Sequence, residues 1–292
     1  MKPTCAAVLL CLTITLGCRS SNHDVLLYGI WKRTDGVAVI QLHRGNVNQI
    51  VKANALRPRG VSQDWTRMLV DLRPIAANEE FLIYYLDRST DSREQFVKTG
   101  VYRKQLNSDE VAQLLVETDR LSSIDRNVSS GEILATTESA TVLLINPLRS
   151  SLRVLDVPAC RFASWASAQH AIVLLTLDGQ EIQTIDVDSG VVQQRVGLPQ
   201  GECTRAFLTQ EPGTYLLQQG WDVILYREAS GKATLMGPSS TRTCVTFARA
   251  HGLAYCLIPD DKDGRTLEAI SLHSGRVQKL IYGVFADRIA VN

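Results

Sequence analysis

A hairpin pattern that recurs about every 40 residues limits the folds open to this chain more than any other feature. Ile40–Val51, Ile185–Val192, Leu225–Lys232 and Ile270–Ile281 each read as an apolar strand, a glycine-containing turn and the start of a second strand. Tight hairpins place a residue at positive φ, which glycine adopts at the lowest cost. In the last three copies the turn glycine recurs at an interval of a little over 40 residues. That interval is typical of units made of four short strands.

A second series of residues has the same period. Cys160, Cys203 and Cys244 each open a segment that reaches a phenylalanine, then a small polar or glycine-containing turn, and then an apolar strand. We expect these cysteines to fill equivalent, half-buried positions, because an unreacted cysteine behaves as a small hydrophobic residue. The phenylalanines are Phe162, Phe207 and Phe247, and the apolar strands are residues 171–175, 214–217 and 253–257.

The two series together predict six copies of four strands each. Residues 81–85 and 133–136 are apolar strands in the same slot, and Val25–Tyr28 begins the first copy. Val284–Val291 is then one strand in excess, which we expect to complete the sheet begun by the N-terminal strands. Closure would remove the two sheet edges that an open array exposes. The predicted fold class is all-β, a six-bladed β-propeller closed when the C-terminal strand pairs with the N-terminal blade.

The turns before the apolar strands carry a resemblance to known proteins. TolB-like and WD-repeat-like propellers have a Ser-Pro-Asp-Gly-like turn between the outermost strand of one blade and the innermost strand of the next. Fragments of it stand at Ala77–Glu80, Ser129–Glu132, Ser167–His170, Gln210–Gly213 and Arg249–Gly252. Over nearly all of residues 25–292, the chain therefore resembles six-bladed propellers of these kinds. The alternative is a pair of β-sandwiches whose turns share a spacing by chance.

The N-terminus has the layout of an export signal. Lys2 is a short basic region, residues 6–17 are apolar or small, and Gly17 precedes Cys18. A helix of such a length rises roughly 18 Å, well short of the roughly 30 Å of a bilayer core. Residues 14–18 resemble the bacterial lipobox, which implies a signal peptide over residues 1–17, lipidation of Cys18 and a polar tether over residues 18–24. The alternative is an ordinary secretory signal cut near Gly17 or Arg19.

Composition narrows the partners of the single domain predicted over residues 25–292. The chain has 31 basic and 30 acidic residues. This balance argues against nucleic acid and against a polybasic membrane surface, since both need clustered Lys and Arg. The resemblance to lipoproteins implies a cell-envelope protein, on the periplasmic face of the outer membrane if the host has two membranes. The lipid anchor is its expected contact with the membrane.

No sequence motif demands a reaction, and we predict no cofactor, catalytic residue or metal ligand as the default. Four histidines fall in turns that open on one face of a propeller, and Glu211 lies in another such turn. Histidine is the commonest metal ligand, and paired turn carboxylates can act as acid and base. The low-ranked candidates for a metal or catalytic site are His43, His170, His251, His273 and Glu211, with Glu79, Glu80 and Glu132 as further turn carboxylates.

Two expectations concern cysteine and tryptophan. Equivalent cysteines on neighbouring blades should lie too far apart for a disulfide, which leaves Cys244 with Cys256 as the least implausible pair. Trp65, Trp165 and Trp221 are expected to be packing residues rather than platforms for a sugar.

The predicted function is that of a non-catalytic binding or assembly module, monomeric and tethered to a membrane. Its partner would be a protein, a peptide or an envelope polymer, with an envelope protein or peptide favoured, because loops on a rigid scaffold are where binding residues gather. The alternative is a propeller hydrolase that acts on a glycan or a lactone.

Overall fold

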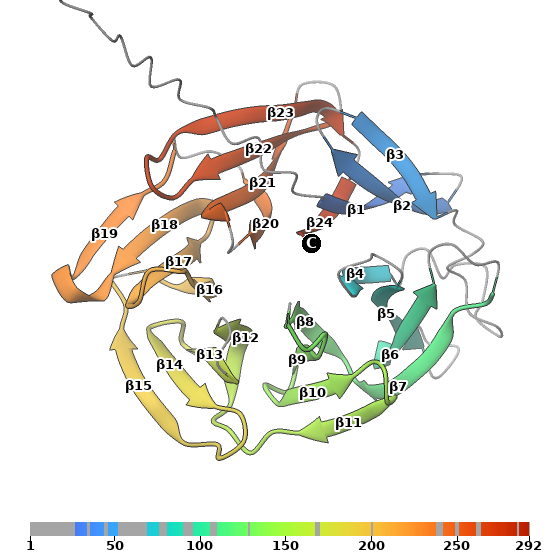
Figure 1. The fold of residues 1–292 in the computed structure, drawn as a ribbon, viewed down its shortest axis with the longest axis horizontal. Helices are drawn as coiled ribbons and strands as arrows, with labels where there is room; N and C mark the ends of the chain where they lie inside the picture. Colours follow the sequence, from blue (N-terminus) through green and yellow to red (C-terminus); the bar gives the residue numbers. More distant parts are fainter. Residues whose placement is uncertain are drawn as a thin grey trace, which may run out of the picture.

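The computed structural model consists of short antiparallel sheets arranged in a ring (Figure 1). It describes residues 27–33, 36–43, 46–51, 69–75, 81–89, 96–105, 110–127, 129–166, 170–199, 201–237, 242–248, 251–260, 264–284 and 286–291. Within this part Glu228–Ser230 is a 3₁₀ turn, His251 also has 3₁₀ conformation, and no helix is long and apolar enough to span a bilayer. Residues 1–26, which hold the predicted signal and Cys18, lie outside the described part.

The strands form six four-stranded sheets, each a meander of neighbouring strands except the one that joins the two ends of the chain. The first two are β24-β1-β2-β3, with β24 Ala286–Val291, β1 Leu27–Arg33, β2 Gly36–His43 and β3 Asn46–Val51, and the sheet β4 Leu69–Ile75, β5 Phe81–Ser89, β6 Phe96–Gln105 and β7 Gln113–Asp119. The next two are β8 Leu121–Arg126, β9 Ile133–Thr137, β10 Val142–Asn146 and β11 Ser151–Val154, and then β12 Cys160–Ala166, β13 Ala171–Thr176, β14 Glu181–Asp186 and β15 Val192–Gly197. The last two are β16 Cys203–Leu208, β17 Thr214–Gln219, β18 Asp222–Arg227 and β19 Lys232–Leu235, and then β20 Thr243–Ala248, β21 Leu253–Pro259, β22 Arg265–Ser271 and β23 Val277–Val284.

The two ends of the chain meet in one sheet. Strand β24 pairs antiparallel with β1, from Leu27 opposite Val291 to Trp31 opposite Ala286. Figure 1 shows β24 near the centre of the ring, beside β20 and β4, and the ring therefore has no open end between its last and first sheets. The closing strand predicted over residues 284–291 is present as Ala286–Val291, while Val284 ends β23.

The prediction of a six-bladed propeller needs correction. The structure describes packed side chains over most of the length of four sheets, from β8 to β23. The number of blades described in this way is four, whereas the prediction was six. The sheets that hold β1–β7 and β24 are described largely through their backbone pairing. The β4–β7 sheet also departs from the repeat, because β5 and β6 have nine and ten residues whereas the strands of β8–β19 have four to seven. What holds for the whole described chain is an all-β, propeller-like ring.

The predicted phase of the repeat was also wrong. The turns at Ser129–Glu132 and Ser167–His170 join the first strand to the second strand of one sheet, β8 to β9 and β12 to β13. They do not join neighbouring blades. The segments that open with Cys160 and Cys203 are themselves the innermost strands, so the connections between blades lie just before them. A period of 40 residues gives the length of a unit but does not determine which strand begins it.

Each innermost strand that begins a described blade contains a β-bulge. The register shifts between Cys160 and Phe162 in β12, and between Cys203 and Arg205 in β16. A further shift lies between Thr243 and Thr246 in β20. A bulge adds a residue to one strand, which bends the strand and increases its twist.

The phenylalanines of these strands pack in a row across three blades. The ring centroids of Phe162 and Phe207 lie 5.2 Å apart, with the rings nearly edge to face. Those of Phe207 and Phe247 lie 6.2 Å apart. All three side chains are buried in one core cluster. They pack together from different register positions, since Phe162 lies opposite Leu175, Phe207 opposite Leu216 and Phe247 opposite Ala254.

Hydrogen bonds between blades reinforce this row. The Ser164 hydroxyl in β12 donates to the carbonyl oxygen of Ala206 in β16 at 2.9 Å, in a buried setting. The Arg205 guanidinium donates to the carbonyl of Val245 in the next blade at 2.7 Å. These bonds fix the height of one innermost strand relative to the next, which an apolar contact cannot do alone.

Replacing Ser164 with alanine tests this contact. The variant loses a buried hydrogen bond between blades, and we expect the free energy of unfolding to fall by about 1 kcal/mol. Urea unfolding of the wild type and the variant measures the change. Ser151→Ala, at an exposed position of β11, is the matched control and should shift stability by less than about 0.5 kcal/mol. Equal effects of the two substitutions would show that the bond contributes nothing.

Candidate functional site

Two sets of turns open at the same end of every meander. In an antiparallel sheet of four sequential strands, the turn from the first to the second strand lies at the same end of the sheet as the turn from the third to the fourth. We call this end of the ring the turn rim. His170 follows β12, His251 follows β20, and His273 follows β22 in turns of these two kinds, while His43 ends β2 before such a turn. The topology therefore places all four predicted histidines at the turn rim.

A backbone hydrogen bond joins the two rim turns within each of three blades. The N–H of Val187 donates to the carbonyl of His170 at 3.0 Å, and that of Leu272 donates to the carbonyl of Gly252 at 2.9 Å. The bond from Glu228 to Gly213, also 2.9 Å, is the copy in the blade between them. The donor residues occupy equivalent positions in the three blades, and so do the acceptor residues. These bonds hold the two rim turns of each blade together without a ligand.

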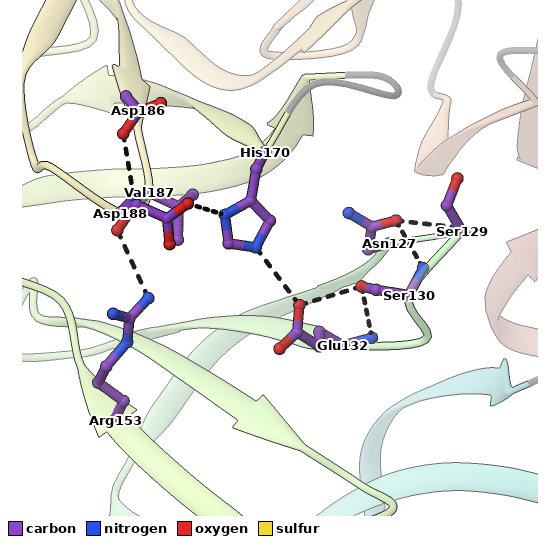
Figure 2. Close-up of polar contacts among 9 residues, drawn as sticks. All are labelled: Asn127, Ser129, Ser130, Glu132, Arg153, His170, Asp186, Val187 and Asp188. Carbon is purple, nitrogen blue, oxygen red and sulfur yellow. Dashed lines mark hydrogen bonds and ion pairs between the residues drawn. The ribbon is translucent and has the colours of Figure 1, made fainter.

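One junction of the turn rim carries a charged cluster from two blades (Figure 2). The Nδ1 atom of His170 lies 3.1 Å from Oδ2 of Asp188 in the same blade. Its Nε2 atom lies 3.6 Å from Oε2 of Glu132, which belongs to the blade β8–β11. The side chains of His170 and Asp188 are 40% and 72% exposed, whereas that of Glu132 is 18% exposed. The histidine thus links two blades through carboxylates on both sides of its ring.

The turn before β9 holds Glu132 in place. The side-chain oxygen of Asn127 accepts hydrogen bonds from the N–H groups of Ser129 and Ser130, at 2.9 and 3.1 Å. The hydroxyl of Ser130 donates in turn to the Glu132 carboxylate at 3.0 Å. An asparagine that accepts from the backbone two and three residues on is a common way to shape a turn. Figure 2 shows this chain of bonds running from Asn127 to His170.

Asp186 shapes the facing turn in the same way. Its carboxylate accepts hydrogen bonds from the N–H groups of Asp188 and Ser189 and from the Ser189 hydroxyl. The bonds from the backbone and the hydroxyl of Ser189 hold the pKa of Asp186 below its usual value, and the neighbouring His170 adds a smaller electrostatic contribution. The turn that carries Asp188 is consequently built on an ionised carboxylate.

Trp165 supports the histidine from the core. Its ring centroid lies 5.9 Å from that of His170, and the side chain is 1% exposed. Its backbone N–H donates to the carboxylate of Asp125 in the preceding blade at 2.8 Å. The packing role predicted for Trp165 is confirmed. The same prediction was wrong for Trp221, which is 56% exposed in the turn between β17 and β18, and Trp65 lies outside the described residues.

The cluster has the groups for ionic recognition and lacks those of a nucleophilic triad. Neither ring nitrogen of His170 bonds a serine or a cysteine in the described part of the chain; both face carboxylates. The Ser130 hydroxyl bonds Glu132 rather than the histidine. Across the described residues, no group of three or more His, Cys, Asp or Glu side chains has the arrangement of a metal site. The arrangement is a fixed set of charges on a partly exposed surface.

The remaining predicted site residues do not join this cluster in the described contacts. Glu211 pairs with Arg227 of its own blade at 3.7 Å and is largely exposed. His251 and His273 lie in another blade, and the side chain of His43 is outside the described part, as are Glu79 and Glu80. The sequence reasoning missed Asp188. A signal was available, because Asp188 holds the same place after its hairpin strand as His273 does.

The cysteines occupy the core. Burial raises the pKa of Cys160 to about 12 and also raises the pKa of Cys203. Both side chains are fully buried rather than half-buried as predicted, at equivalent places in β12 and β16. Cys256 is a thiol in β21 and forms no disulfide with Cys244, the pair that the sequence left as the least implausible. The bulge between Thr243 and Thr246 shifts Cys244 out of regular register with β21.

Comparison with known proteins supports the fold. No protein family matches the sequence. No curated protein matches it either. Among solved structures, TolB from Acinetobacter baumannii has a TM-score of 0.62 at 9% identity, over 91% of this chain and 66% of TolB. The fold is that of a β-propeller.

Two further structures show how general this propeller likeness is. A chain of the nidogen/laminin complex has a TM-score of 0.58 at 12% identity, over 91% of this chain and 97% of its own. U3-55K has a TM-score of 0.51 at 9% identity, over 78% of this chain and 68% of its own. This propeller spans about two thirds of the length of TolB. Identities this low show a shared fold alone.

Proposed function

We propose that this chain is an exported, lipid-anchored binding module that offers the turn rim of its propeller to a protein partner in the cell envelope. Propellers of similar fold include TolB and a chain of the nidogen/laminin complex, the latter solved in a complex between proteins. A rigid scaffold with clustered turns at one end is suited to such a role.

The cluster of Glu132, His170 and Asp188 carries this proposal. Its carboxylates and imidazole come from two blades, and backbone hydrogen bonds hold their turns in place. Binding of a partner therefore costs little conformational entropy at these residues. His170 and Asp188 are exposed enough to be reached.

The anchor is proposed from the N-terminal sequence. Gly17 and Cys18 end the apolar signal, and acylation of Cys18 would leave residues 19–24 as a short polar link to the first strands. Several acyl chains hold a protein on a membrane far more firmly than one chain does. In a host with two membranes, the proposed place is the periplasmic face of the outer membrane.

Substitutions at the turn rim test the binding role. The full chain carrying Asp188→Asn with His170→Ala should recover about tenfold less cross-linked partner from envelope membranes than the wild type, since both exposed groups of the cluster are changed. Asp178→Asn is the matched control: it removes the same kind of charge from an exposed turn between β13 and β14, at the opposite end of the meander. Equal recovery by all three proteins, or loss with Asp178→Asn as well, contradicts a partner at the turn rim.

Incorporation of labelled palmitate tests the anchor. Cells that express the full chain should incorporate the label into it and retain it in the membrane fraction. Cys18→Ser removes the only thiol that the lipobox resemblance assigns, and should abolish both labelling and retention. Labelling that survives this substitution would contradict the anchor, and soluble, unlabelled wild-type protein would do so as well.

A further inference from the structure

Exposed apolar side chains gather on two neighbouring outer strands. Of the ten large hydrophobic residues that are exposed in the described chain, five belong to or adjoin β7 and β11. These two strands follow one another along the outside of the ring (Figure 1). The Arg103 guanidinium, which bonds Gln113 of β7 and the carbonyl of Pro147 before β11, ties the two blades together there. The five residues are Val111, Leu114, Leu148, Leu152 and Val154.

Strand β11 is the last strand of its sheet and has an open edge. It pairs with β10 alone among the described strands, and all four of its residues are exposed. The N–H of Leu155 donates to the carbonyl of Val142 in β10. Because the bonding direction alternates along an antiparallel strand, Arg153 also faces β10, whereas the N–H and C=O groups of Leu152 and Val154 point outward. The free edge of β11 thus offers two N–H donors and two C=O acceptors, those of Leu152 and Val154.

Strands β15 and β23 carry more edge-blocking side chains than β11. Two or more exposed glutamine, lysine or arginine side chains lie along each of them, and such residues discourage pairing at a sheet edge. Strand β11 has one, Arg153, whose guanidinium donates to the carbonyl of Val187 in the next blade. Its Leu152 and Val154 stand two positions apart and so lie on one face, where they are 37% and 59% exposed. An open edge with an apolar face beside it matches the surface that an extended peptide adds to.

Charge selects the kind of segment that would fit. The stretch Leu148–Val154 contains Arg149 and Arg153, both exposed, and no acidic residue. Two copies of β11 paired with each other would bring these like charges together across the new ladder, which is destabilising. A segment with acidic side chains would instead meet them with opposite charge.

We propose that β11 is a docking edge for an extended segment of a partner protein, which adds a fifth strand to the β8–β11 sheet. Alternate apolar side chains of that segment pack on Leu152 and Val154, and acidic side chains among the rest lie near Arg149 and Arg153. This surface adjoins the cluster at His170, because the Arg153 guanidinium donates to the carbonyl of Val187 at 3.4 Å (Figure 2). The proposal does not rest on the binding role proposed for that cluster.

Selection from a random ten-residue peptide library displayed on phage tests the docking edge, with the full chain as target. We expect the selected sequences to alternate apolar with polar residues and to be rich in Asp and Glu. We further expect these peptides to bind Val154→Pro at least about tenfold more weakly than the wild type, because proline removes an outward N–H that the added strand needs. Proline is tolerated on edge strands where that N–H faces solvent.

Val154→Ala is the matched control, since it trims the side chain and keeps the N–H, and should cost less than about threefold in affinity. Equal urea midpoints for the three proteins would show that the sheet is intact. If the proline variant is less stable, Leu152→Lys replaces it, because it keeps every backbone group and places an edge-blocking charge on the apolar face. Selected peptides without alternation, or peptides that bind Val154→Pro as well as wild type, would overturn the proposal. A wild-type dimer by light scattering that becomes monomeric in Val154→Pro would also overturn it, since the occupant would then be a second copy of this chain.

Discussion

The contact between innermost strands is the interaction on which the rest of this structure depends. A four-stranded sheet with apolar residues on both faces cannot bury them alone, so each blade needs a neighbour on either side. Phe207 meets Phe162 of one blade and Phe247 of another, and the Ser164 hydroxyl bonds the strand that carries Phe207. A chain of such contacts leaves two uncovered faces unless its ends meet, and the pairing of β24 with β1 brings them together.

The sequence predicted those parts of the fold that repeat. The period of about 40 residues located the hairpins, the row of phenylalanines and the excess strand at residues 284–291. It could not say which strand of a unit is innermost, because a period is the same whatever strand it is counted from. It also gave six like copies, whereas β5 and β6 are longer than the strands of the four blades whose side chains are described over most of their length. Bulges in β12 and β16 add a residue without a residue-type signature, and such irregularities are visible only in the register.

The candidate site was predicted in part for the same reason. His170 and Glu132 were both selected as turn residues of one face, and they do meet across two blades. Asp188 was missed because it lies in a hairpin that was used only to measure the repeat. Contacts between turns of different kinds depend on the backbone bond from Val187 to His170, which fixes their spacing and is not encoded by either side chain. The exposed Trp221 and the thiol of Cys256 show the same limit, since exposure and pairing follow from register.

Hydrogen exchange of the amides in β24 tests the closed ring most directly. If the last strand pairs with β1 and packs between β20 and β4, the amides from Ala286 to Val291 that bond in the sheet should be protected to the same degree as those of β20 and β21. Protection of the two ends together, lost in one cooperative step on adding denaturant, is the predicted result. Exchange of the β24 amides at the rate of an unpaired chain, while β20 and β21 stay protected, would contradict the account.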